Sequence, residues 1–390
     1  MHPSAPTSLA LFCKVVDNYG DIGICWRLAR QLWREHGVRV SLWVDELGSF
    51  RRICPQVDVL AAEQEVEGVR VLHWTGREGS FAPEQVADIV IEFFAVDLPP
   101  GYVEAMAQRS PRPVWFNLEG LTAEEWDEGC HRLPSMHPRF KLTKHFFFPG
   151  FTAKTGGLLH EAGLTEARLA FQADRAAMAR FLAPFGLTGQ EMDNLKVSLF
   201  CYPHAPVAAQ LAAWAEGERP VTCLVPEGVA VEAVRDFLGA DPRAGAFATR
   251  GALTLRVLPF VPQPDYDRLL WACDLNFVRG EDSFVRAQWA GRPFVWHIYP
   301  QEENLHHKKL RAFLARYAGG LDALSTYSLG WNGACEIASW PQAWQELQAA
   351  MPEITDRAEA WRVAVLAHGD LTTQLLEFAR ALGLAQESPV

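Results

Sequence analysis

The chain has 390 residues, of which 49% are hydrophobic and 21% are charged, and its formal net charge is -11. The length predicts two domains, the composition is that of a globular protein, and the acidic balance argues against general nucleic-acid binding, which needs a basic surface. No run approaches about 18 apolar residues, so we expect no membrane-spanning helix. The first apolar run has no basic segment before it, and the eight cysteines form no CxxC pair. We therefore expect a cytoplasmic protein with reduced thiols.

The first half of the chain alternates short apolar segments with helical ones. After the apolar run 8–16, Ile22, Trp26 and Ala29 recur at helical spacing, and Gly37 ends that helix. Further buried strands are expected at 38–44, 69–74, 87–94 and 112–118, with helical sequence at 101–108. Short apolar strands that alternate with helices predict a parallel sheet covered on both faces.

The middle of the chain leads into a second domain of the same kind. Residues 149–157, PGFTAKTGG, have the composition of a turn region, and 166–186 have the pattern of one amphipathic helix. Strand and helix signals then alternate again, with strands expected within 195–202, 221–228, 253–262, 274–280 and 292–300, and the last thirty residues are helical. The chain thus predicts two tandem Rossmann-like α/β domains, 1–188 and 189–362, that face a central cleft. Helices within 363–390 are expected to pack back on the first domain.

Open α/β sheets bind ligands beyond the carboxyl ends of their strands, so the loops after strands are the places where chemistry is expected. The first such loop, DNYGDIG, places Asp17 and Asp21 between the first strand and the first helix. It lacks the GxGxxG dinucleotide fingerprint. Asp21 serves either as a simple helix N-cap or, with Asp17, as a carboxylate pair that holds a cationic group or accepts its proton. Gly20 and Gly23 would let such a group approach the backbone.

A second loop of interest lies in NFVRGEDSFVRAQW. A buried strand ends just before Arg279, and Glu281, Asp282 and Ser283 begin a helix. A helix N-terminus beside a guanidinium suits a diphosphate, with plain helix capping by Asp282 or Ser283 as the alternative. Arg286, one turn later, is more typical of a solvated or structural charge.

Aromatic residues recur in and after the strands of the second half. They are Phe200, Tyr202, Phe260, Tyr266 and Tyr299. Aromatic residues in strands are usually core residues, whereas those that follow a strand beside proline suit stacking on a nucleotide base. Gln263 suits a hydrogen bond to that base. The twelve histidines show no HExxH or paired-ligand spacing, so no metal site is expected.

Three stretches strongly resemble the EarP family, bacterial protein-arginine rhamnosyltransferases that modify elongation factor P. They are FCKVVDNYGDIGICWRLARQL, FFFPGFTAKTGGLL and DLNFVRGEDSFVRAQWAGRPFVWHIYPQ, and the resemblance extends over nearly the whole chain. It implies a GT-B glycosyltransferase fold, dTDP-β-L-rhamnose as the donor, and inversion at the anomeric carbon. It also implies an arginine side chain of elongation factor P as the acceptor, with no cofactor and no metal requirement.

The same resemblance assigns roles to individual residues. It implies that Asp21 is the general base, that Asp17 positions the acceptor with it, and that Glu281 is a third catalytic residue. The acceptor is expected to bind at Asp17, Asn18, Tyr19, Gly20 and Asp21. The donor is expected to bind at Phe200, Tyr202, Phe260, Gln263, Tyr266, Arg279, Glu281, Asp282, Ser283 and Tyr299. Tyr266 stands where the family often has Phe.

Two other interpretations remain open from the residues alone. One is a nucleotide-sugar-dependent transferase that acts on a small-molecule acceptor. The other is a non-catalytic two-domain binding protein whose cleft closes on a ligand. Release of nucleoside diphosphate only when the acceptor protein is present would distinguish the protein-modifying enzyme from both.

Overall fold

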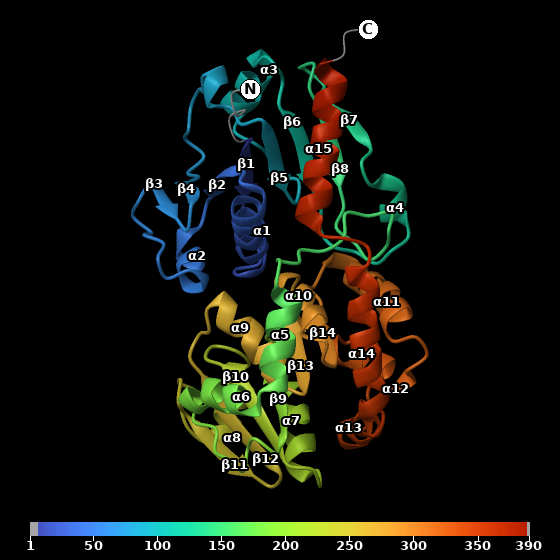
Figure 1. Cartoon of the computed structure of the whole chain (residues 1–390). Coiled ribbons are helices and arrows are strands. Elements are labelled where there is room, and N and C mark those ends of the chain that lie inside the picture. The colour runs from blue at the N-terminus through green and yellow to red at the C-terminus, as the bar shows by residue number, and fades with distance from the viewer. Residues whose placement is uncertain (1–6, 388–390) are drawn as a thin grey trace. The chain divides into compact units, whose positions relative to one another are not determined.

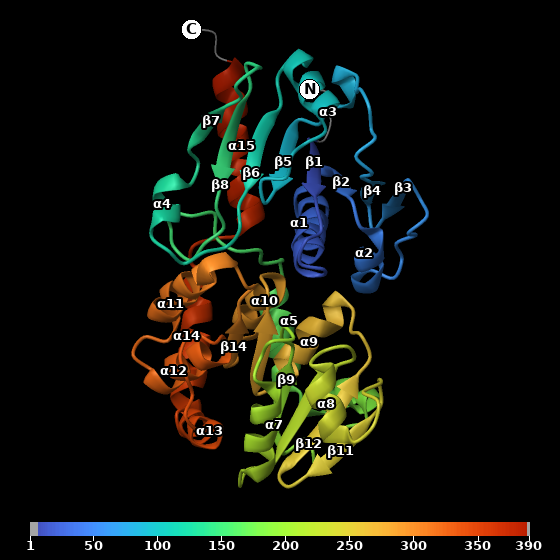
Figure 2. The ribbon, with the colours of Figure 1, turned by 180° about the vertical axis from the view of Figure 1, so that it is seen from behind.

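The chain folds into two compact units, which the computed structural model describes over residues 7–387 (Figures 1 and 2). The first unit takes the chain up to Ala162 and again from Val365 onward, and the second unit is Gly163–Ala364. The ends of the predicted domains at 1–6 and 388–390 lie outside the described residues. The division at residue 162 differs from the predicted boundary at 188, because the helices that follow Gly163 pack on the second unit.

The first unit is built on an eight-stranded sheet in the order β3-β4-β2-β1-β5-β6-β8-β7. Its strands are β1 (Ser8–Cys13), β2 (Arg39–Val44), β3 (Glu63–Val66), β4 (Val69–His73), β5 (Ile89–Phe93), β6 (Val114–Leu118), β7 (Pro134–Met136) and β8 (Thr143–Phe147). All neighbours pair in parallel except β3 and β7, the antiparallel edge strands. The predicted parallel core is confirmed, while β3, β7 and β8 were missed because they are polar or short.

Helices cover both faces of this first sheet. They are α1 (Gly20–His36), α2 (Leu47–Ile53), α3 (Pro100–Gln108), α4 (Trp126–Cys130) and α15 (Leu371–Glu387), with a 3-10 turn η1 (Pro83–Gln85). Phe116 of β6 contacts Phe378 of α15, whereas its neighbour Trp115 packs into a core cluster with Met106 of α3. Successive strand residues point to opposite faces, so α15 and α3 lie on opposite sides of the sheet (Figure 1). Residues 363–390 were expected on the first domain, and α15 belongs to that unit.

The second unit has a six-stranded sheet in the order β11-β12-β10-β9-β13-β14. Its strands are β9 (Leu195–Leu199), β10 (Val221–Pro226), β11 (Phe247–Arg250), β12 (Leu253–Leu258), β13 (Leu275–Arg279) and β14 (Phe294–His297), and only β11 is antiparallel to its neighbour. Its helices are α5 (Leu164–Ala173), α6 (Arg175–Leu182), α7 (Val207–Glu216), α8 (Val231–Leu238), α9 (Gln263–Ala272), α10 (Asp282–Ala290), α11 (Leu305–Tyr317), α12 (Asp322–Trp331), α13 (Trp340–Ala349) and α14 (Met351–Leu366). Two 3-10 turns are η2 (Ala183–Phe185) and η3 (Glu302–Asn304).

The single amphipathic helix predicted over 166–186 is wrong, because the structure has two helices there. Helix α5 ends at Ala173, and the next residue, Asp174, has an extended backbone (φ -101°, ψ 92°). The Asp174 carboxylate accepts a hydrogen bond of 2.9 Å from the Ala177 N–H and so caps α6. An aspartate at the N-cap favours a helix start over a continuous helix. Both helices pack near α9, which places them in the second unit.

Each sheet has one place where the strand order reverses. In the first unit the chain runs from β1 outward to β2 and β4 and then returns to β5 on the other side of β1. In the second unit it runs from β9 to β10 and β12 and then returns to β13 on the other side of β9. Ligands of open α/β sheets bind at such switch points. The loops after β1 and β5, and those after β9 and β13, are therefore the candidate sites.

Candidate functional site

The loop after β1 is an acidic turn that is held together by Asp21. One oxygen of its carboxylate, Oδ2, accepts hydrogen bonds from the N–H groups of Val16 (2.7 Å) and Asp17 (2.8 Å). The side chain is only 4% exposed. The N-cap of α1 is Tyr19, which makes no side-chain cap hydrogen bond. The interpretation of Asp21 as a plain N-cap is therefore wrong, because its carboxylate reaches back to the preceding turn rather than to the helix.

Electrostatics make the Asp21 carboxylate more basic than an ordinary one. Burial raises its pKa, and the nearby carboxylates of Asp17 and Asp45 raise it further, while the two N–H hydrogen bonds act in the opposite direction. Asp45 follows β2 and accepts a hydrogen bond of 2.8 Å from the Val15 N–H. Three carboxylates thus influence one another at this switch point, an arrangement that favours a cation or a proton.

The other residues expected to bind the acceptor lie in the same turn. Asp17 is half-buried, and Asn18 is exposed with a left-handed backbone (φ 35°). The Tyr19 hydroxyl accepts a hydrogen bond of 3.0 Å from Arg52 Nη1. A Cβ on Gly20 would lie 2.8 Å from Asp17 Oδ2, closer than a real Cβ contact. The absence of a side chain at Gly20 therefore leaves space for the Asp17 carboxylate.

The structure adds a neighbouring loop that sequence reasoning missed. Phe94 and Ala95, just after β5, both have positive φ (57° and 53°). The Ala95 N–H donates to Asn117 Oδ1 (3.0 Å), and the buried Asn117 donates in turn to Glu119 (2.6 Å). Such backbone is unusual for a bulky residue, and strain of this kind clusters at functional sites. No glycine marks the turn, so the sequence reads as a simple continuation of the strand.

In the second unit, Arg279 lies between two aromatic rings. Its guanidinium carbon is 4.4 Å from the centre of the Phe200 ring and 4.9 Å from that of Tyr202. Arg279 Nη1 donates to the Cys201 carbonyl oxygen at 3.3 Å. Cation–π contacts fix the plane and position of a guanidinium. Two aromatic residues that were expected to bind the donor thus also contact this arginine.

The turn after β13 shapes the start of α10. Gly280 has φ 62°, which glycine adopts without strain. The Ser283 hydroxyl accepts from the Arg279 N–H (3.1 Å) and donates to the Arg279 carbonyl oxygen. Glu281 is the N-cap of α10 and makes no side-chain cap hydrogen bond. Ser283 therefore closes the turn, and the helix N-terminus, followed by the half-buried Asp282, lies beside Arg279.

The loop after β12 and the first turn of α9 carry three more predicted donor residues. Phe260 is half-buried, and Gln263, only 4% exposed, makes a long hydrogen bond of 3.5 Å to Asp282 Oδ2. The Tyr266 ring is 6.0 Å from that of Phe200, and burial raises the pKa of its hydroxyl. The structure thus brings together donor residues from the segments that follow β9, β12 and β13.

Two further residues of the second unit that the sequence singled out are Tyr299 and Arg286. Tyr299, after β14, is 42% exposed, and its ring centre lies 5.6 Å from that of Tyr202. Arg286 is buried and makes two hydrogen bonds to the Asp267 carboxylate, at 2.9 and 2.8 Å. Arg286 is thus a structural charge that ties α10 to α9.

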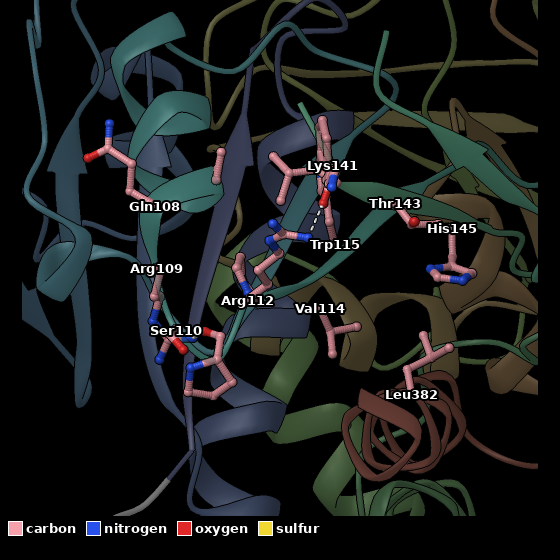
Figure 3. Close-up of a pocket in the computed structure, with 14 residues that line it drawn as sticks. Gln108, Arg109, Ser110, Arg112, Val114, Trp115, Lys141, Thr143, His145 and Leu382 are labelled. Carbon is pink, nitrogen blue, oxygen red and sulfur yellow. Dashed lines mark hydrogen bonds between the residues drawn. The ribbon is translucent and has the colours of Figure 1, made fainter. Parts of the chain in front are cut away.

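A separate cavity of about 680 Å³ lies in the first unit, at the amino ends of β6 and β8 (Figure 3). Arg109, Arg112 and Lys141 contribute to its lining, and Arg112 donates to the Lys141 carbonyl oxygen at 2.7 Å. The cavity lies at the amino ends of the parallel strands, whereas the acidic turn follows the carboxyl end of β1. None of the predicted site residues lines the cavity. It is therefore distinct from the switch-point sites.

Residues 7–387 contain no group of three histidine, cysteine, aspartate or glutamate side chains placed to hold a metal ion. Within the same range, no helix combines the length and apolar character needed to cross a membrane.

Comparison with known proteins gives a family match over nearly the whole chain. Residues 9–380 match the family model described as Elongation-Factor P (EF-P) rhamnosyltransferase EarP. A protein-arginine rhamnosyltransferase of Pseudomonas putida is 49% identical over 376 residues, covering 95% of this chain and 98% of that protein. Another, of Shewanella oneidensis, is 38% identical and covers 95% and 97%.

A solved structure shares the fold. It is described as the structural basis for EarP-mediated arginine glycosylation of translation elongation factor EF-P. It matches with a TM-score of 0.65 at 36% identity and covers 96% of this chain and 99% of its own. The two Rossmann-like units are therefore those of a GT-B glycosyltransferase.

Proposed function

The chain belongs to the EarP family of protein-arginine rhamnosyltransferases, and from this premise we propose its reaction. It transfers L-rhamnose from dTDP-β-L-rhamnose to an arginine side chain of elongation factor P, with inversion at the anomeric carbon. The first unit binds the acceptor arginine, and the second unit binds the nucleotide-sugar donor.

One observation carries the proposal: the two units place different charged groups at equivalent places. The switch point of the first unit holds the carboxylates of Asp17, Asp21 and Asp45. That of the second unit holds the Arg279 guanidinium at the end of β13, beside the N-terminus of α10 where Glu281 and Asp282 also lie. Carboxylates suit a cationic acceptor, and a guanidinium at a helix N-terminus suits a diphosphate.

The acidic turn supplies what the acceptor chemistry needs. A free guanidinium has a pKa above about 12 and is a poor nucleophile while charged. As its nitrogen forms a bond to the anomeric carbon, that nitrogen would gain a second positive charge, so its proton becomes acidic. Asp21, with its raised pKa, accepts this proton, and Asp17 orients the guanidinium and localises its charge.

The second unit stabilises the group that leaves. The bond between the anomeric carbon and the donor diphosphate breaks as the new C–N bond forms, and the electron pair stays on the phosphate oxygen. Arg279 and the N–H groups at the start of α10 stabilise the resulting charge. Glu281, the N-cap of α10, lies next to this position, and we assign it a contact with the sugar of the donor. Phe260 and Tyr266 flank the nucleotide base, and Gln263 makes a hydrogen bond to that base.

The test is the intact mass of elongation factor P after incubation with the protein and dTDP-β-L-rhamnose. We expect the mass of elongation factor P to increase by that of one deoxyhexose residue. We expect no increase when the acceptor arginine is replaced by lysine. A parallel reaction with dTDP-glucose tests the choice of sugar. An unchanged mass with every donor would overturn the proposed reaction.

The same reaction mixtures separate the other interpretations. Release of dTDP with free arginine in place of elongation factor P would favour a small-molecule acceptor. Binding of donor without release of dTDP under any condition would favour a non-catalytic binding protein.

A further inference from the structure

Two histidines lie beside the donor residues of the second unit and were not singled out by any sequence motif. His297 is the last residue of β14 and is 0% exposed. His204 lies in the loop between β9 and α7, 93 residues earlier, and its Nε2 is 2.8 Å from the Nε2 of His297. The Nδ1 of His297 is 3.2 Å from the backbone nitrogen of Tyr202, a predicted donor residue.

These contacts fix the proton positions on both rings. The Tyr202 N–H can only donate, so Nδ1 of His297 accepts and carries no proton. In the neutral ring the proton is then on Nε2, which donates to His204. The Nε2 of His204 accepts, so its own proton is on Nδ1. A directed chain of hydrogen bonds therefore runs from Tyr202 through His297 to His204.

The charged groups around His297 all favour its neutral form. His204 faces it from the β9–α7 loop, Arg279 from the end of β13, and His306 from α11. Burial and these three positive or titratable neighbours lower the pKa of His297 to about 3. The imidazole thus stays neutral at physiological pH and keeps Nδ1 available as an acceptor.

The chain of hydrogen bonds begins at Tyr202, the residue that contacts Arg279. Tyr202 contacts the Arg279 guanidinium with its ring, which also lies parallel to the ring of His204 with 6.1 Å between their centres. His297 contacts the edge of the same ring, at 5.3 Å between centres. Both histidines therefore limit the movement of Tyr202, and through it the movement of Arg279.

We infer that His297 and His204 are positioning residues for the donor diphosphate, acting through the backbone and ring of Tyr202 on the Arg279 guanidinium. The inference rests on the proposed function only in naming a nucleoside diphosphate as the ligand. The hydrogen-bonded pair itself is a property of the free protein. Neither histidine takes part in bond making or breaking.

The first experiment examines the pair in the protein without ligand. Imidazole 15N chemical shifts should show His297 protonated on Nε2 and His204 on Nδ1 at neutral pH. His204→Leu should shift the Tyr202 amide resonance. The opposite proton assignment, or an unmoved Tyr202 amide, would overturn the inference whatever the protein's reaction is.

The second experiment measures dTDP affinity by calorimetric titration of three variants. His204 is exposed, so its substitution leaves the core intact. His204→Leu should weaken dTDP binding by about threefold to tenfold, the usual effect of one lost hydrogen bond. His204→Gln, whose side-chain oxygen can accept from His297, should bind nearly as well as the parent. His307→Leu is the matched control, because His307 bonds to the Asn332 carbonyl oxygen instead.

The outcomes separate this inference from the proposed reaction. Equal dTDP affinity in His204→Leu and the parent would overturn the positioning role and leave the reaction standing. A parent protein that binds no nucleoside diphosphate would overturn the donor class, and the donor role of the pair with it. Loss of binding in His204→Gln as severe as in His204→Leu would also contradict the chain of hydrogen bonds.

Discussion

Replacement of Asp21 by asparagine separates catalysis from structure at the acidic turn. In the protein, one carboxylate oxygen accepts both N–H groups, from Val16 and Asp17. The asparagine carbonyl oxygen can take the same place, so both hydrogen bonds survive. What disappears is the negative charge and the ability to accept a proton. Turnover should fall by about 10² to 10⁴-fold, the usual effect of a lost general base.

Stability should respond differently from activity. Burial and two neighbouring carboxylates raise the pKa of Asp21 above that of the unfolded chain, so ionised Asp21 opposes folding at neutral pH. Asp21→Asn should therefore melt at the same temperature as the parent or higher at pH 7. The difference should shrink as the pH falls and vanish below about 4, the pKa of an aspartate in the unfolded chain, where Asp21 is protonated in both states. Asp21→Ala leaves two N–H groups without acceptor and should cost about 2–4 kcal/mol.

The assays are thermal melting at the two pH values, dTDP titration, and single-turnover rate with elongation factor P. Binding of dTDP should be unchanged in Asp21→Asn, because the donor residues belong to the other unit. Full activity in this variant would refute the general-base assignment. Early melting of Asp21→Asn together with recovered activity at low temperature would show that the turn is structural.

Three further substitutions test other parts of the two units. Arg279→Ala should weaken dTDP binding by about 2–4 kcal/mol in calorimetry, and an unchanged affinity would remove Arg279 from the donor site. Gly20→Ala should raise the KM for elongation factor P without lowering the melting temperature much, because its Cβ displaces the Asp17 carboxylate; an unchanged KM would show that Asp17 does not contact the acceptor. Arg286→Leu should destabilise the second unit by about 3–5 kcal/mol in denaturant unfolding, because it leaves the buried Asp267 carboxylate without its partner. Adding Asp267→Leu should restore part of that loss, and failure to do so would mean that the pair is not the cause.

Much of the fold could be predicted from local patterns. The apolar strands β1, β5 and β6 are buried along their length, so each appears in the sequence as a short hydrophobic run. Helix α1 appears as a periodic stripe that ends at Gly37, whose φ of 65° suits glycine. The antiparallel edge strands have fewer buried residues and were missed, because an edge strand needs no continuous apolar run.

The division between the units depended on packing that no local pattern records. Asp174 divides α5 from α6 by capping the second helix, and both helices then pack on α9. An amphipathic stripe indicates that a helix has a buried face, but it does not indicate which sheet that face covers. The boundary near 188 was predicted from the point where strands and helices begin to alternate again, whereas the structure sets it at 162 by contact.

The sequence by itself determined that the chain has two α/β domains and that charged loops follow their strands, because periodicity and turn chemistry depend on neighbouring residues. Only the tertiary structure decided how those charges are used. It directs the Asp21 carboxylate to the N–H groups of Val16 and Asp17, and it brings His204 to His297 across 93 residues. The contact between the two histidines depends on the order in which the strands pair, and strand order is a property of the whole sheet rather than of any segment in it.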